Sequence, residues 1–170
     1  LSREVELSGK SPLTLLGIQF IKAAAAFHYT HDPTFWYYPQ TPLVDFVTGA
    51  LMLVGMVEAI WHWRWPSRGL TLLWFWLTLI MAWVVTENPP SSQRGLLLMP
   101  AVALLVAWGA RALWRFVLRK PLWIRNFVLL CLLISIIWNV HFYFGVYTPR
   151  RVYGNPTSEI ATEFVQFCEI

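Results

Sequence analysis

The stretch GLTLLWFWLTLIMAWVVT, Gly69–Thr86, is 18 residues long and contains no charged side chain. An α-helix needs roughly 20 apolar residues to cross the hydrocarbon core of a bilayer, which is about 30 Å thick. Three further apolar runs have nearly this length, over 42–63, 96–117 and 126–147. Backbone groups in lipid must be satisfied internally, and these runs lack the alternation of a barrel strand. The sequence therefore predicts an all-α integral membrane protein with about four transmembrane helices.

The overall composition indicates the same class of protein. Hydrophobic residues make up 57% of the 170 residues and charged residues only 13%, with a mean hydropathy of +0.52. A soluble domain averages about 45–50% apolar and about 25% charged residues. The composition excludes an ordinary soluble domain. The net charge of +4 shows no pattern typical of a nucleic-acid-binding protein.

The positions of the apolar runs divide the chain into three parts. Residues 1–41 are expected to form an amphipathic helix and an aromatic loop at the outer face of the membrane. Residues 42–147 are expected to form the four-helix transmembrane domain, and residues 148–170 a short outer tail.

The N-terminal helix has its own start signal. Ser11-Pro12 is typical of a helix start, with serine as the cap and proline in the first turn. The apolar residues that share one face of this helix should lie against the membrane interface, whereas Gln19 and Lys22 should lie elsewhere. These apolar residues are Leu16, Phe20, Ala24 and Phe27.

Charge placement orients the predicted helices. The connections WRWPSRG and RALWRFVLRKPLWIR contain seven basic residues and no acid, whereas eight of the nine acids fall on the other side. Basic short loops mark the cytoplasmic face, so both termini should lie on the outer face of a bacterial cytoplasmic membrane. Arg111, Arg115 and Arg119 recur every four residues and are expected to anchor the helix to anionic lipid headgroups.

Arg94 lies in the polar hairpin TENPPSSQRG, residues 86–95, between two apolar runs. A guanidinium at the outer lipid boundary suits bidentate contact with a phosphate. The alternative is a solvated turn with an ordinary boundary arginine. The sequence alone does not decide between phosphate binding by Arg94 and a solvated turn.

Asp45 opens the first apolar run, in TPLVDFVTGAL. It could bind a substrate hydroxyl or pair with Arg94, or it could cap the start of a helix, where the helix dipole favours a carboxylate.

The remaining polar side chains within the runs have structural interpretations beside functional ones. Glu58 is expected to pair with Arg64 in a structural ion pair. No spacing of Cys, His and acids predicts a metal site. His141 could hydrogen-bond across helices or ligate a haem or chlorophyll-type pigment. Cys131 and Cys168 are both expected to be free thiols.

Three segments of the sequence together resemble a known protein family. They are PLVDFVTGAL at 42–51, ENPPSSQR at 87–94 and MPAVALLVAWG at 99–109. In this order and spacing they resemble the C-terminal half of GT-C class membrane glycosyltransferases. The similar family is glycosyltransferase family 39, related to protein mannosyltransferases and the aminoarabinose transferase. The resemblance covers roughly Asp32 to Leu113.

This resemblance implies a polyprenyl-phosphate-linked sugar as donor and transfer at the outer membrane face. Arg94 would then bind the lipid phosphate, and Asp45, Trp36 and Tyr38 would line the entrance. The family's N-terminal half, which carries its catalytic acid, has no counterpart in the 170 residues. We therefore expect the chain to build the donor pocket without catalysing transfer alone, and to need that missing half or other membrane subunits as partners. Membrane lipids are the other expected partners, and no cofactor is expected.

An alternative function belongs to another class. The chain could be a non-catalytic accessory subunit of a multi-subunit photosynthetic or respiratory membrane complex. Its many aromatic residues would then pack against neighbouring helices, lipid or pigment, with His141 as a possible pigment or haem ligand.

Overall fold

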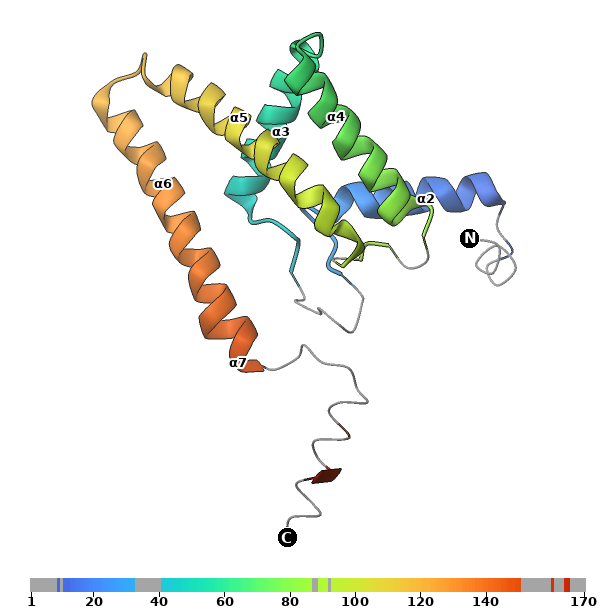
Figure 1. Ribbon diagram of the computed structural model, residues 1–170. Coiled ribbons are helices and arrows are strands. Elements are labelled where there is room, and N and C mark those ends of the chain that lie inside the picture. The colour runs from blue at the N-terminus through green and yellow to red at the C-terminus, as the bar shows by residue number, and fades with distance from the viewer. Residues whose placement is uncertain are drawn as a thin grey trace.

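A computed structural model shows how the chain folds (Figure 1). It describes residues 9, 11–32, 41–86, 89–91, 93–150, 160, 164 and 165. Every regular element in this described part of the chain is a helix. The elements are α2 (Pro12–Ala25), α3 (Phe46–Trp61), α4 (Pro66–Leu79), the π-helix η1 (Ile80–Val84), the 3-10 helix η2 (Arg94–Leu98), α5 (Met99–Val117), α6 (Leu122–His141), the π-helix η3 (Phe142–Tyr147) and α7 (Thr148–Arg150).

Three continuous helical segments are long and apolar enough to cross a membrane. They are Pro66–Val84, Arg94–Val117 and Leu122–Tyr147. The predicted run 42–63 is helical only over its 16 residues Phe46–Trp61. At 1.5 Å per residue this helix rises about 24 Å, which is less than the hydrocarbon thickness of about 30 Å. The all-helical class is confirmed, while three segments within the described residues have spanning length.

Helix α2 begins where the sequence predicts, but it buries a different face. Ser11 accepts a hydrogen bond from the backbone of Thr14 at 3.3 Å, and Pro12 occupies the first turn. The buried residues of α2 are Leu15, Gln19 and Ala23, whereas Phe20 and Ala24 are exposed. Gln19 therefore lies on a different face from Phe20 and Ala24, as the sequence predicts, and this face packs on the rest of the protein. Helix α2 packs against η1.

Helices α3 and α5 form the most extensive packing in the described part of the chain. Gly55 of α3 lies against the Leu105 carbonyl of α5, and Gly109 of α5 lies against the Leu51 carbonyl of α3. A Cβ at either glycine would overlap the facing backbone. Small residues that allow backbones to approach are typical of helix pairs in membranes. This glycine crossing therefore fixes α3 and α5 side by side.

The hairpin between α4 and α5 is anchored on a buried tryptophan. Trp83 is fully buried, and its indole N–H donates a hydrogen bond to the carbonyl of Ser91 at 2.7 Å. Gly95 lies against the same indole, where a side chain would collide with the ring. The hairpin is thus fixed on either side of Arg94, which is exposed and begins η2.

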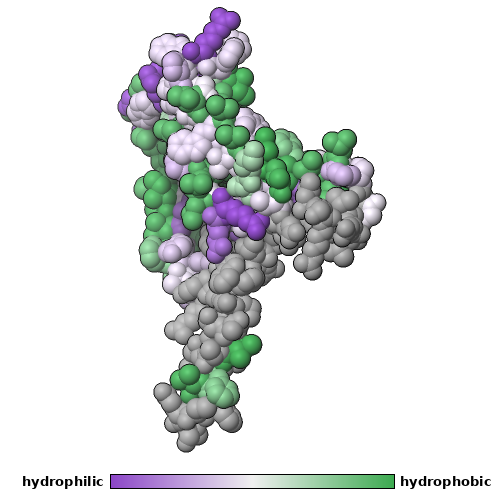
Figure 2. Space-filling view, turned by 45° about the vertical axis from the view of Figure 1, so that its right-hand side comes forward, coloured by the Kyte–Doolittle hydropathy of each residue, from purple (hydrophilic) through white to green (hydrophobic). Residues whose placement is uncertain are grey.

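The two ends of the helical bundle differ in charge. The connections 62–65 and 118–121 lie at the same end, at the top of Figure 1, and we call this the basic end. Helices α3 and α5 begin at the opposite end, and α2 lies crosswise beside it. Figure 2 shows hydrophilic side chains at the top of the molecule and a second hydrophilic group about midway down, beside a largely hydrophobic flank. The position of both basic connections at one end agrees with the charge asymmetry of the sequence.

Helix α6 stands apart from the other helices. None of the residues of Leu122–His141 is buried. Its exposed side chains are almost all apolar, as at Leu130, Ile134 and Ile137. An apolar helix with this much exposed surface must be covered by lipid or by another protein.

Candidate functional site

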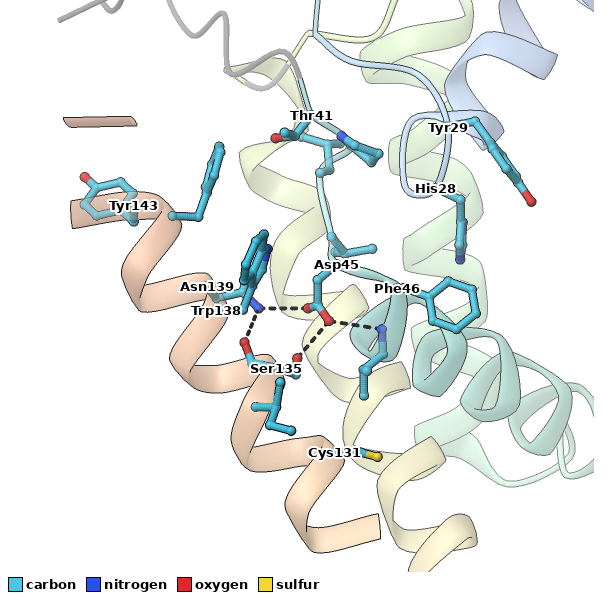
Figure 3. Close-up of a pocket in the computed structure, with 16 residues that line it drawn as sticks. His28, Tyr29, Thr41, Asp45, Phe46, Cys131, Ser135, Trp138, Asn139 and Tyr143 are labelled. Carbon is cyan, nitrogen blue, oxygen red and sulfur yellow. Dashed lines mark hydrogen bonds between the residues drawn. The ribbon is translucent and has the colours of Figure 1, made fainter. Parts of the chain in front are cut away.

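A cavity of about 840 Å³ separates α6 from the segment that leads into α3 (Figure 3). Residues 41–47 form one wall, and residues of α6 and η3 between Cys131 and Tyr143 form the other. His28 and Tyr29, which follow α2, also line it. Most of the lining is apolar, from residues such as Leu43, Ile134 and Phe142. We call this space the α3–α6 cavity.

Asp45 forms the polar centre of the cavity. One carboxylate oxygen, Oδ1, accepts hydrogen bonds from the backbone N–H groups of Val47 and Thr48 at 3.0 and 3.2 Å. These bonds cap the start of α3, so the capping interpretation is confirmed. The Thr48 hydroxyl donates to the other oxygen, Oδ2. A capping carboxylate also interacts favourably with the helix dipole.

Two residues of α6 bind the same carboxylate. The Ser135 hydroxyl donates to Oδ1 at 2.7 Å, and the Asn139 amide donates to Oδ2 at 3.0 Å (Figure 3). The Asn139 amide also donates to the Ser135 carbonyl at 2.8 Å. We call Asp45, Thr48, Ser135 and Asn139 the Asp45 cluster. It links α3 to α6 across about ninety residues of sequence.

Sequence reasoning did not single out Ser135 or Asn139. The available signal was their spacing of four residues within an otherwise apolar run. Residues at this spacing share a helix face, and polar residues on one face of a membrane helix often hydrogen-bond to a neighbouring helix.

His28 supplies a second polar group beside the cavity. Its ring packs on Gly49 of α3, where a Cβ would come within 2.7 Å of the imidazole Nε2. This nitrogen is buried and has no hydrogen-bond partner among the described residues. Buried polar atoms normally have a partner, so this nitrogen is an unsatisfied polar group beside the cavity.

The other predicted residues lie elsewhere. Arg94 is not among the residues that line the cavity. His141 is exposed on α6 and also lies outside the lining. Trp36 and Tyr38 fall outside the described residues. Cys131 is a free thiol that lines the cavity and is partly buried, whereas Cys168 lies outside the described residues.

The expected partner of Glu58 is wrong. Its carboxylate pairs with Arg68 at a distance of 3.2 Å, not with Arg64. Arg68 lies in the first turns of α4 and is buried, whereas Arg64 is an exposed turn residue. Both charged side chains of the pair are only 10% exposed. The interpretation as a structural pair therefore holds with a different arginine.

Among the described residues, no three His, Cys, Asp or Glu side chains gather where they could hold a metal ion. Comparison of the chain with models of protein families, with curated proteins and with solved structures finds no match. The glycosyltransferase resemblance accordingly remains a prediction from sequence.

Proposed function

We propose that the chain is the membrane part of a glycosyltransferase that holds a polyprenyl-phosphate-linked sugar in the α3–α6 cavity. The observation that carries this proposal is the cavity itself, with apolar walls and a polar centre. Its volume of about 840 Å³ lies within the range of about 300–1,000 Å³ that is typical of ligand pockets.

The chemistry of the lining suits an amphiphile. Apolar side chains such as Leu43, Val44 and Ile134 would contact a polyprenyl chain. Thr41 would contact sugar hydroxyls. A ligand with one apolar and one hydroxylated part therefore matches the cavity better than a fully polar one.

Asp45 would shape this site rather than act as an acid or base. Both of its oxygens already accept hydrogen bonds from Thr48, Ser135, Asn139 and the backbone. A carboxylate that is occupied in this way is a poor general base, because abstracting a proton would break the bonds that position it. The catalytic acid would come from the enzyme's other half.

Arg94 does not line the α3–α6 cavity, so it would bind the lipid phosphate where the phosphate projects from the cavity, at the same end of the bundle. Helix α3 begins just after Asp45, and η2 begins at Arg94, both away from the basic end (Figure 1). Trp83 fixes the backbone next to this arginine through its hydrogen bond to Ser91 and its contact with Gly95. A positive group near the phosphate would stabilise the charge that develops when the lipid phosphate leaves.

Replacing Arg94 with alanine should weaken binding of a long-chain polyprenyl phosphate to the full chain in detergent. Loss of a charge-assisted hydrogen bond worth about 1.5–3 kcal/mol predicts a Kd about tenfold to a hundredfold higher. A binding titration checks this. Arg64→Ala is the matched control, since it removes an exposed arginine from the basic end. Equal affinity of Arg94→Ala and Arg64→Ala would contradict the phosphate role.

The exposed surface of α6 favours a second candidate, an accessory subunit of a larger membrane complex. A helix with no buried residue suits packing against other subunits as well as against lipid. In that case the chain would co-purify in a fixed ratio with other subunits from native membranes, and it would not bind polyprenyl phosphate.

A further inference from the structure

A second pocket lies at the basic end of the bundle. It has a volume of about 310 Å³ and lies among the ends of α3 and α5 and the start of α4. Its charged lining residues are Glu58, Arg68, Arg111 and Arg115. We call it the basic pocket.

The inner part of the basic pocket is rigidly built. Arg68 is only 8% exposed and pairs with Glu58 at 3.2 Å. Its guanidinium carbon lies 5.4 Å from the ring centroid of Trp65 and 5.5 Å from that of Trp108. Stacking between two indoles stabilises an arginine through cation–π interactions. This arginine is therefore held in place before any ligand arrives.

Hydrogen bonding inside the pocket is incomplete. The Nε of Arg68 and the second carboxylate oxygen of Glu58 are buried and have no hydrogen-bond partner among the described residues. An unsatisfied buried polar group is costly, and more so when it is charged. A small ligand that both accepts and donates hydrogen bonds would relieve this cost.

The pocket also carries excess positive charge. Glu58 neutralises Arg68, which leaves Arg111 and Arg115 one turn apart on α5. Arg119 follows the same four-residue spacing in the sequence, but it does not line the pocket. Two guanidinium groups in one pocket match the geometry of a phosphate.

We propose that the basic pocket binds a phosphate group that also carries a hydroxyl, with the headgroup of an anionic phospholipid as its source. Arg111 and Arg115 would hold the phosphate oxygens. The ligand's hydroxyl would donate to the unpaired oxygen of Glu58. A lipid source fits the position of the pocket at the ends of apolar helices, where headgroups lie if the chain spans a membrane. The same phosphate chemistry would also accept free inorganic phosphate.

The test is native mass spectrometry of the full chain released from detergent and titrated with three probes. The probes are phosphatidylglycerol, phosphatidylcholine and inorganic phosphate. We expect the chain to retain phosphatidylglycerol preferentially, and the variant Arg111→Ala/Arg115→Ala to bind it at least about tenfold more weakly. The matched control Arg119→Ala/Arg125→Ala removes the same charge outside the pocket and should bind as the wild type does.

Each outcome decides the proposal. If both double variants weakened the binding of phosphatidylglycerol equally, the lipid would be attracted diffusely to basic residues, and the proposal that the basic pocket binds it would be wrong. Equal retention of phosphatidylcholine would overturn anion selectivity. Binding of inorganic phosphate as tight as that of the lipid would support the phosphate site with a free anion as its source.

If the alanine pair fails to fold, Arg111→Lys/Arg115→Lys should still bind more weakly than Arg119→Lys/Arg125→Lys, because lysine loses the bidentate geometry. Failure of polyprenyl phosphate binding at the other end of the bundle would leave these outcomes unchanged.

Discussion

Replacing Gly55 with leucine should abolish the packing of α3 against α5 and leave little folded protein. A Cβ at Gly55 would overlap the Leu105 carbonyl and lie 2.9 Å from the backbone nitrogen of Gly109. Overpacking against side chains typically costs about 1–3 kcal/mol. Here the obstacle is backbone, which cannot change rotamer, so the cost should exceed that range. Thermal unfolding followed by circular dichroism in detergent, together with size-exclusion chromatography, measures the loss.

Gly17 provides the matched control for this substitution. It also lies within a helix, α2, but nothing lies within 4 Å of the position that its Cβ would take. Gly17→Leu should therefore unfold close to the wild-type temperature. If Gly55→Leu and Gly17→Leu had the same unfolding temperature, the glycine crossing would not hold α3 and α5 together.

Replacing Asp45 with alanine should release α6 from α3. The substitution removes the N-terminal cap of α3, which is typically worth about 0.5–2 kcal/mol. It also leaves the Ser135 hydroxyl and one Asn139 N–H without their acceptor. Because α6 has no buried residue of its own, the Asp45 cluster is its main polar link to the bundle. The position of α6 should therefore become much less defined.

Pulsed electron paramagnetic resonance measures this release. Spin labels at the exposed positions Leu53 and Ile137, in a background with both cysteines replaced by serine, report the distance between α3 and α6. We expect a narrow distance distribution in the parent and a broad one in Asp45→Ala. Ser135→Ala/Asn139→Ala should broaden it as well while keeping the helix cap. A distribution that stays narrow in Asp45→Ala would mean that other contacts position α6.

Much of the fold follows from local sequence signals. Long apolar runs predict the segments that contain α4, α5 and α6, and Ser11-Pro12 predicts the start of α2. Asp45 is recognisable as a cap because a carboxylate before an apolar run satisfies the free N–H groups of a helix start. The clustering of basic residues in two connections also predicts that these connections share one end of the molecule. Each of these signals can be recognised without knowing which distant segments pack together.

What sequence reasoning missed depends on contacts between distant segments. Proximity in sequence favours Arg64 as the partner of Glu58, but α4 turns back and brings Arg68 to the carboxylate instead. The bonds from Ser135 and Asn139 to Asp45 join segments about ninety residues apart, so neither run alone reveals them. The burial of Gln19 likewise depends on the elements that pack against α2, which the local sequence pattern of this helix does not show. These contacts depend on how the helices pack against one another, and no short pattern in the sequence shows that packing.

Photo-crosslinking of the full chain in membranes with a long-chain polyprenyl phosphate that bears a diazirine tests whether the α3–α6 cavity binds this lipid. Mass spectrometry then maps the labelled residues. The α3–α6 cavity predicts labelling concentrated in residues 41–47 and 131–143, which excess unlabelled lipid removes and which Ile134→Trp, by filling the cavity, reduces severalfold. Labelling that excess lipid does not remove, or that spreads equally over the exposed faces of α4 and α5, would contradict a lipid-binding cavity.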